Sequence, residues 1–323
     1  MSAGLSISPL DDGRARRLHE SAKSTGGRGA TRSTPRLERW LPQLVISPAF
    51  LVSVLFFYGL MLWVVLVSFT DSEGLIQYGW AGLRQHQRLW ADDNWWRALW
   101  NLLRYLPIVV GIPMVVGCLL AILLDQKVRF EGSFRTLYLY PLALSWIVSG
   151  TVWRWLLSPD TGIEAWLHGM GWESALFDWI VRPDRAIFAL SVVAVWHATG
   201  FVMAMFIAGL RAVDDTVFKA AMIDGASLPR IYWRIVLPTL RPTVFSAALI
   251  LLPAALKTFD LVVVLTHGGP GQSSVLPAFY MFDRFFRRDQ MGLAAASGSI
   301  ILMMSIAIAV PYILGELRKQ RHA

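Results

Sequence analysis

The sequence predicts an all-α membrane protein with about six transmembrane helices, N-in and C-in, and three observations support this fold class. Hydrophobic residues make up 55% of the 323 positions and charged residues only 16%, whereas a soluble domain usually carries about 25% charged residues. Several long runs are continuously apolar and lack the alternation of membrane barrel strands. Each run reaches the roughly 20 residues with which an α-helix crosses ~30 Å of hydrocarbon. A helix also satisfies its own backbone hydrogen bonds in lipid.

Six runs meet this length requirement. In chain order they are Leu44–Phe69, Tyr105–Leu124, Leu137–Leu157, Ala186–Leu210, Val244–Thr266 and Leu293–Leu314. With both termini on the inside, the inner segments hold 19 Lys and Arg residues and the outer segments hold 8. Basic residues favour the cytoplasmic side of a membrane. The charge distribution therefore predicts N-in and C-in, and the net charge of +8 requires no nucleic-acid partner.

The predicted spans divide the chain into a leader, one membrane domain and a tail. Residues 1–43 carry eight Arg or Lys and no apolar core of a signal peptide, so we expect a disordered cytoplasmic leader beside anionic lipid. Residues 44–315 would form the transmembrane domain and residues 316–323 a cytoplasmic tail. The single cysteine, Cys118, lies within the second predicted span, where reactivity is not expected.

The outer loops are rich in aromatic residues and glycine. The loop from Asp71 to Asn101 ends in "NWWRALW", and the spacing predicts an interfacial helix anchored by Trp before the second span. A ligand role for these Trp residues is not needed to explain them. The last outer loop contains "THGGPGQSS", a tight turn that lacks the lysine of a phosphate-binding P-loop.

No pattern of catalytic residues stands out. The six histidines are scattered, and no H-E-x-x-H motif or cysteine pair suggests a metal site. The adjacent acids Asp92-Asp93 and Asp214-Asp215 are typical of helix caps. We therefore expect no enzyme activity, no bound metal and no cofactor in this chain.

The loop between the fourth and fifth spans, residues 213–242, has a different character. Asp214 or Asp215 is placed to cap a short helix that Gly225 ends. Ser227 is placed to cap a second helix with Pro229 in its first turn, and we expect Pro238 and Pro242 to stop that helix. The predicted helix–turn–helix would either dock another protein through its small residues or rest on lipid headgroups.

The motif "AAMIDGASLPRIYWRIVLPTLRP" favours docking, because it resembles the cytoplasmic loop of permease subunits of binding-protein-dependent ABC importers. The matching positions are Ala220-Ala221, Asp224-Gly225-Ala226, Ile235, Leu237-Pro238 and Pro242. The family usually has Glu where this chain has Lys219. The loss of one exposed ion pair is worth only about 0–1 kcal/mol, so this departure leaves docking possible.

The resemblance implies a set of partners. It implies that Lys219, Ala220, Ala221, Asp224, Gly225, Ala226, Leu237 and Pro238 contact an ATPase subunit. The other expected partners are a second permease of similar fold, an extracytoplasmic sugar-binding protein, membrane lipid and the sugar itself. ATP and Mg would be bound by a pair of ATPase subunits and not by this chain. The expected location is the inner (plasma) membrane.

The substrate class follows from a second resemblance. The segment "LKTFDLVVVLTHGGPG" is similar to sugar permeases of the maltose-transporter first-subunit type, and "KTFDLV" with "FYMFDRFF" is most similar to glucose/mannose-type permeases. This resemblance implies import of a monosaccharide. The alternatives are a permease for another sugar or for glycerol phosphate, and an ion-coupled secondary transporter.

Three of the polar residues within the predicted spans are candidates for a pathway or helix-packing role. Lys257 and Asp260 are three residues apart in the fifth predicted span, and a charge at the bilayer centre costs ~2.5–3.5 kcal/mol. We expect them on one helix face, where they either form an ion pair that fixes helix packing or line the pathway. His197 is either a satisfied interior histidine or a further pathway residue.

Overall fold

The structure is a computed structural model that describes residues 36–74, 79–126, 130–172, 174 and 176–320. It comprises two compact units, Met1–Leu60 and Met61–Ala323. The described residues of the first unit belong to one helix, α2 (Arg36–Val67). This helix begins before Leu44, the predicted start of the first span, and so includes the end of the predicted leader. The rest of the leader, residues 1–35, lies outside the described residues.

Every regular element among the described residues is helical, which confirms the predicted all-α class. The single extended pairing found there is a bridge between Thr70 and Trp80. After α2 the helices are α3 (Arg84–Trp90), α4 (Asp93–Asp125), α5 (Glu131–Ala143), α6 (Trp146–Leu156), α7 (Ile163–Gly169), α8 (Ala186–Arg211), α9 (Asp215–Ile223), α10 (Leu228–Ile231), α11 (Leu237–Thr239), α12 (Arg241–Leu256), α13 (Asp260–Leu265), α14 (Pro277–Phe282) and α15 (Met291–Gln320).

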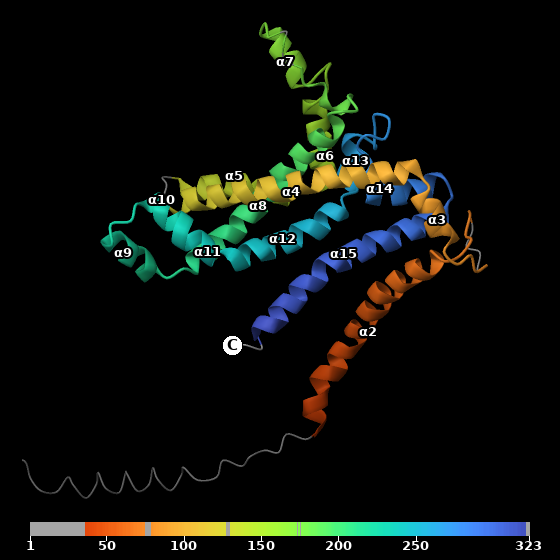
Figure 1. The fold of residues 1–323 in the computed structure, drawn as a ribbon, viewed down its shortest axis with the longest axis horizontal. Helices are drawn as coiled ribbons and strands as arrows, with labels where there is room; N and C mark the ends of the chain where they lie inside the picture. The colour runs from red at the N-terminus through yellow and green to blue at the C-terminus, as the bar shows by residue number, and fades with distance from the viewer. Residues whose placement is uncertain (1–35, 75–78, 127–129, 173, 175, 321–323) are drawn as a thin grey trace, which may run out of the picture. The chain divides into compact units, whose positions relative to one another are not determined.

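The central pair of the second unit is α4 and α8, which pack along much of their length (Figure 1). Two glycines permit the close approach of α8 to its neighbours. A Cβ atom at Gly117 would lie 2.8 Å from Val202, and a Cβ atom at Gly200 would lie 2.0 Å from the Tyr138 carbonyl oxygen. Because packed interiors leave no room for an added carbon, these positions require glycine.

Two apolar clusters occupy opposite parts of the α4–α8 pair. One joins the first half of α4, including Trp95 and Tyr105, to α13, α14 and the start of α15. The other joins the last turns of α4, around Leu124, to Phe206 of α8 and to the segment after α9. Helices α9 to α11 consequently lie at one end of the unit and α3 and α14 at the other (Figure 1).

Four described stretches are long and apolar enough to cross a membrane, and one bent pair would make a fifth. They are Ile46–Val67, Asp93–Asp125, Ala186–Arg211 and Met291–Pro311, with Leu228–Thr239 and Arg241–Leu256 joined at 63°. The first, second, fourth and sixth predicted spans therefore correspond to continuous helices. The last of them, α15, continues to Gln320, well into the predicted tail 316–323.

The third and fifth predicted spans are not continuous helices. The third breaks between α5 and α6, where Leu144 adopts an extended conformation and Ser145 accepts a hydrogen bond from the Val148 amide at 3.2 Å. Ser145 is thus a helix N-cap. The fifth breaks at residues 257–259, between α12 and α13. Apolar composition alone does not reveal either break.

The predicted interfacial helix before the second span is not a separate element. The segment "NWWRALW" forms the first turns of α4, which runs without interruption from Asp93 to Asp125. Asp92 caps it by accepting a hydrogen bond from the Asn94 amide at 2.9 Å. The cap satisfies an amide that the first turn leaves free, so the helix begins at Asp93 and no turn separates it from the span.

Candidate functional site

The first candidate site is the loop 213–242, which begins with the predicted capped helix. The Asp214 carboxylate accepts a hydrogen bond from the Thr216 amide at 2.8 Å, and α9 follows from Asp215 to Ile223. The same hydrogen bond lowers the pKa of Asp214 below its usual value. The carboxylate therefore stays ionised at the positive end of the helix dipole.

Gly225 ends α9 as predicted. Its φ of +78° is in the left-handed region, which glycine adopts at no steric cost. The Ala226 amide donates to the Ala221 carbonyl and the Gly225 amide to the Met222 carbonyl, both at 3.0 Å. These two bonds form a Schellman motif, so the turn after α9 has a defined geometry.

The second arm of the loop differs from the prediction. Ser227 precedes α10 as expected, but its side chain makes no capping hydrogen bond. The second helix ends at Thr239, between Pro238 and Pro242, where the chain bends by 63°, as expected. Unlike the prediction, it is not one regular helix, because a π-helical segment, Tyr232–Val236, separates α10 from α11. Pro238 is tolerated because it lies in the first turn after the π segment.

Buried contacts join the loop to the ends of the central helices. Ala221, with 7% exposure, packs with Ile231 and Val236 in the cluster that includes the last turns of α4 and α8. The Tyr232 hydroxyl donates a hydrogen bond of 2.9 Å to Asp125, the last residue of α4. The loop is therefore attached to both helices through side chains that are far apart in sequence.

The opposite side of the loop is open to solvent. Lys219, Ala220 and Asp224 are exposed as the docking prediction requires. Ile223, which the sequence analysis did not single out, is 86% exposed. Met222 and Leu228 are exposed as well. Exposed apolar residues gathered around a charged turn are typical of a surface that binds a partner.

The eight predicted docking residues do not all share this surface. Ala221 is directed into the apolar cluster, and Leu237 is partly buried. Pro238 lies in the second arm, beyond the π segment. The exposed face could have been located from the helical spacing of Lys219 and Ile223. Ile223 lies four residues after Lys219 in α9, one turn further along the same face of the helix.

The second group of candidates lies in the helices. His197 is 5% exposed and stacks on Trp146 at the start of α6, with ring centroids 4.1 Å apart. The Leu144 backbone is hydrogen-bonded to the imidazole, but Nε2 has no partner among the described residues. His197 therefore lies beside the break between α5 and α6 with one polar atom unused.

Lys257 and Asp260 do not lie on one helix face, so that expectation was wrong. Lys257 follows the last residue of α12, and Asp260 is the first residue of α13. Both side chains are exposed, and in the described structure no ion pair joins them. Thr258, between them, is within 3.3 Å of the Tyr105 hydroxyl. The polar residues mark the break and do not form a charged stripe.

A buried ion pair near the other end of the unit was not predicted. Arg284, in a π-helical segment Asp283–Arg287 after α14, contacts Asp92 at 2.5 Å with side-chain exposures of 7% and 17%. The Tyr280 hydroxyl donates to the same carboxylate at 2.7 Å. Burial and this hydrogen bond raise the pKa of Tyr280 far above its usual range, so Tyr280 remains a neutral donor. Only the cap role of Asp92 was visible in the sequence.

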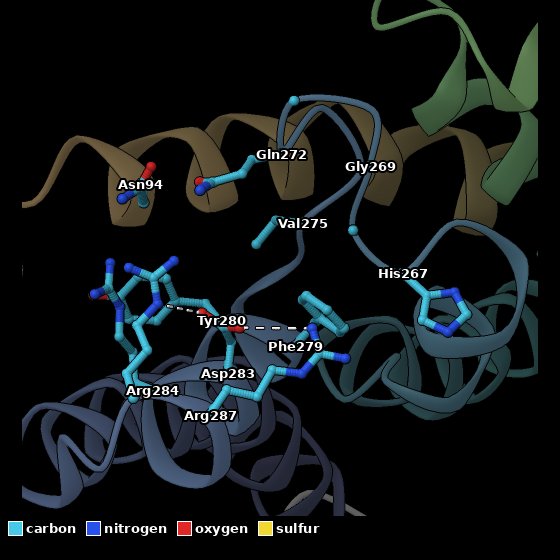
Figure 2. Close-up of a pocket in the computed structure, with 13 residues that line it drawn as sticks. Asn94, His267, Gly269, Gln272, Val275, Phe279, Tyr280, Asp283, Arg284 and Arg287 are labelled. Carbon is cyan, nitrogen blue, oxygen red and sulfur yellow. Dashed lines mark hydrogen bonds and ion pairs between the residues drawn. The ribbon is translucent and has the colours of Figure 1, made fainter.

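This ion pair lies beside a cavity of about 240 Å³ (Figure 2). The cavity is lined by Asn94 of α4, by the glycine-rich turn that contains Gly269, and by Arg284 and Arg287. In Figure 2 the turn lies along α4 with Gln272 next to it. The charges here are already matched, because Arg287 and Arg288 both pair with Asp283. Nowhere in the described residues do three His, Cys, Asp or Glu side chains gather as a metal site would need.

These features define a helical protein with several helices long and apolar enough to cross a membrane, and with an exposed, partly apolar loop at one end of its second unit. Residues 79–319 match the family described as binding-protein-dependent transport system inner membrane component. The chain belongs to this family. Its members are ABC transporter permeases, which do not themselves catalyse a reaction.

Two relatives and one solved structure illustrate the similarity. The chain is 36% identical over 272 residues to a protein of Pyrococcus horikoshii named "Probable ABC transporter permease protein", which covers 84% of this chain and 93% of the relative. It is 33% identical over 258 residues to the xylose/arabinose import permease protein of Haloferax volcanii, covering 78% and 80%. The structure of a bacterial ABC transporter that imports the acidic polysaccharide alginate has a chain that matches with a TM-score of 0.74 at 19% identity, covering 88% of this chain and 97% of that one. This last match supports the fold alone.

Proposed function

We propose that this chain is the permease subunit of an ABC importer that carries a sugar across the inner membrane, driven by ATP hydrolysis on partner subunits. The observation that carries the proposal is the loop 213–242. Its exposed face presents Ile223 and Lys219, and its buried face is attached to α4 and α8. A partner that moves this loop would therefore move both central helices.

The proposed assembly follows from the family. It contains a second permease, two ATPase subunits that bind ATP and Mg, and an extracytoplasmic sugar-binding protein. We place six spans in the membrane with both termini inside, the third formed by α5 with α6 and the fifth by α12 with α13. In a bilayer, breaks of this kind are tolerated where the backbone faces protein or a water-filled cavity, which supports placing both breaks at the pathway.

For the solute we propose a monosaccharide such as glucose or mannose. The support is the resemblance of "KTFDLV" and "FYMFDRFF" to glucose/mannose-type permeases. Relatives named for xylose/arabinose, for trehalose/maltose and for glycerol 3-phosphate show that the family carries solutes of several kinds. The identity of the sugar therefore needs a test of its own, apart from the test of ATP-driven import.

Reconstitution of the whole importer tests the proposal. The chain, its second permease, the ATPase subunits and the binding protein are purified together and placed in proteoliposomes with ATP inside. We expect ATP-dependent uptake of glucose or mannose that requires the binding protein. Uptake driven by an ion gradient in the absence of ATP would contradict the importer and favour the ion-coupled alternative, for which Asp260 is the candidate acid. ATP-driven uptake of a different solute would correct the sugar class alone.

His197 is the pathway residue that we propose for hydrogen bonding to the sugar. Its Nε2 has no partner among the described residues and lies next to the Trp146 ring, and an aromatic face beside a polar group suits a sugar. We expect His197→Ala to raise the KM for the sugar about ten-fold with little change in complex yield, because one hydrogen bond to a neutral partner is worth about 0.5–1.5 kcal/mol.

Uptake kinetics in proteoliposomes measure this effect. Lys257→Met serves as the comparison, since Lys257 lies outside the Trp146 stack and we expect a smaller change in KM. A lower complex yield with unchanged KM would assign His197 a packing role only.

A further inference from the structure

A second cavity, of about 410 Å³, lies between α4 and two loops and shares Gly271 and Gln272 with the first cavity. Helix α4 contributes most of its wall, and the loops contribute Pro183 and Ser273. The residues from α4 are Trp96, Arg97, Trp100, Asn101 and Arg104. Two cations and two indole rings therefore face one concave space.

The two arginines of this cavity differ from those of the first. Arg284 pairs with Asp92, and Arg287 and Arg288 share Asp283. For Arg97 and Arg104, in contrast, the described residues supply no acidic partner within salt-bridge distance. The second cavity thus carries two unmatched positive charges, and an anion would be the complementary ligand.

The walls of the cavity are fixed by contacts. The Trp96 indole donates to the Trp90 carbonyl at 2.9 Å. Asn101 donates to the Val275 carbonyl at 3.0 Å and so holds the loop that contains Ser273 against α4. Arg104 lies over the Trp100 ring, 5.5 Å from its centroid. The Ser273 hydroxyl is buried and has no partner in the described part of the chain, which leaves a donor for a ligand.

The length of α4 sets the depth of the cavity in a membrane. A helix of 33 residues is about 50 Å long, whereas hydrocarbon is ~30 Å thick. About 20 residues counted back from Leu124 reach Tyr105. Arg104 and Trp100 then lie within about 8 Å of the hydrocarbon edge, in the headgroup zone where Trp and Arg residues meet lipid phosphates. Arg97 lies about 12 Å from that edge, and its long side chain can extend back toward the phosphates.

An exposed apolar face of α4 leads away from the cavity into the hydrocarbon depth. Pro107, Gly111, Val115, Leu119 and Leu123 follow one another in steps of four residues and are all exposed. Pro107 and Gly111, next to the cavity, have small side chains, and a Cβ added at Gly111 would meet nothing within 4 Å. The face offers room for an acyl chain directly beneath the two arginines.

We propose that this cavity binds the phosphate headgroup of an anionic phospholipid, in the leaflet at the end of the unit opposite the loop 213–242. Arg97 and Arg104 contact the phosphate, Ser273 donates to it, and the acyl chains lie along the exposed face of α4. The proposal rests on the placement of α4 across the bilayer and does not depend on which solute is transported.

Native mass spectrometry of the complete importer tests the proposal. The complex is released from nanodiscs of phosphatidylcholine with added phosphatidylglycerol, and the retained lipid is identified. We expect retained phosphatidylglycerol for the unchanged protein. For the double variant R97Q/R104Q we expect roughly 25-fold weaker retention, because each basic residue near an anionic membrane surface contributes about a five-fold effect. The variant R288Q is the control, and we expect retention to be unchanged because Arg288 already pairs with Asp283.

Three outcomes would overturn the proposal. Equal retention by the double variant and the unchanged protein would show that lipid binds elsewhere. Displacement of the lipid by soluble glycerol 3-phosphate would identify a solute site, because a soluble phosphate cannot use the apolar face of α4. If R97Q/R104Q retains the lipid but its ATP hydrolysis is no longer stimulated by the sugar-binding protein, the cavity would be a protein-docking surface instead.

If the double variant does not assemble, the unchanged complex still tests the idea. A phosphatidylglycerol with a photoreactive headgroup should label residues 96–104, and labelling confined to other segments would contradict the site. Neither measurement involves transport, so failure here is separable from failure of the proposed function.

Discussion

Ile223→Asp is expected to abolish ATP-driven uptake while leaving membrane insertion intact. Ile223 is 86% exposed at the end of α9 and is not a member of either buried cluster, so the change should not disturb the fold of the loop. In the docked complex the new carboxylate would be buried without a partner. Such burial costs on the order of 3 kcal/mol, which weakens docking about a hundred-fold.

Two measurements on the same preparation check this expectation. Uptake in proteoliposomes reports the function, and co-purification of the ATPase subunits reports docking. Ile223→Val is the matched control, since it keeps an apolar side chain at the same position and should preserve both. Normal uptake by Ile223→Asp would show that the exposed face of α9 is not the docking surface.

Arg284→Met is expected to destabilise the protein by about 3–5 kcal/mol, a large effect for a single substitution. The substitution leaves the Asp92 carboxylate buried and without its cation, although the Tyr280 hydroxyl still donates to it. Removing one partner of a buried pair is far more costly than removing both. Thermal denaturation of the detergent-solubilised complex measures the loss.

The double variant Asp92→Asn with Arg284→Met supplies the control. The asparagine Oδ1 would still cap α4 by accepting the Asn94 amide, and its Nδ2 would donate to the Tyr280 hydroxyl oxygen, while the side chain carries no charge. We therefore expect the double variant to be more stable than Arg284→Met alone. A double variant that loses as much stability as both single changes added together would falsify the account of an uncompensated buried charge.

Local features of the loop 213–242 could be predicted from the sequence because each depends on neighbouring residues. The cap at Asp214 requires only an acid before a helix, and the turn at Gly225 requires only a residue that tolerates positive φ. The π-helical segment could not be predicted, because it depends on the packing of Tyr232 against Phe218 and its hydrogen bond to Asp125. The expected stop at Pro238 and Pro242 is still found, because the helix ends at Thr239 and the chain bends at Leu240.

The breaks in the helices escaped prediction for a related reason. Mean hydropathy does not distinguish α12 with α13 from one uninterrupted span, because the apolar runs on both sides outweigh the polar residues Lys257, Thr258 and Asp260. The lysine and aspartate that looked like a pair on one face belong to the two sides of that break. Arg284 with Asp92, nearly two hundred positions away, is a contact that no local pattern contains.

The uninterrupted course of α4 has a mechanical consequence. This helix reaches from the Tyr232 hydrogen bond at Asp125 to the buried ion pair beside its first turn, so polar contacts join it to other segments near both ends. A rod of about 50 Å that pivots near one end converts a tilt of about 5° into a displacement of roughly 4 Å at the other. In the proposed importer, a small rotation of α4 at one end would therefore produce a side-chain-sized movement at its other end, and no relay of residues through the interior would be required.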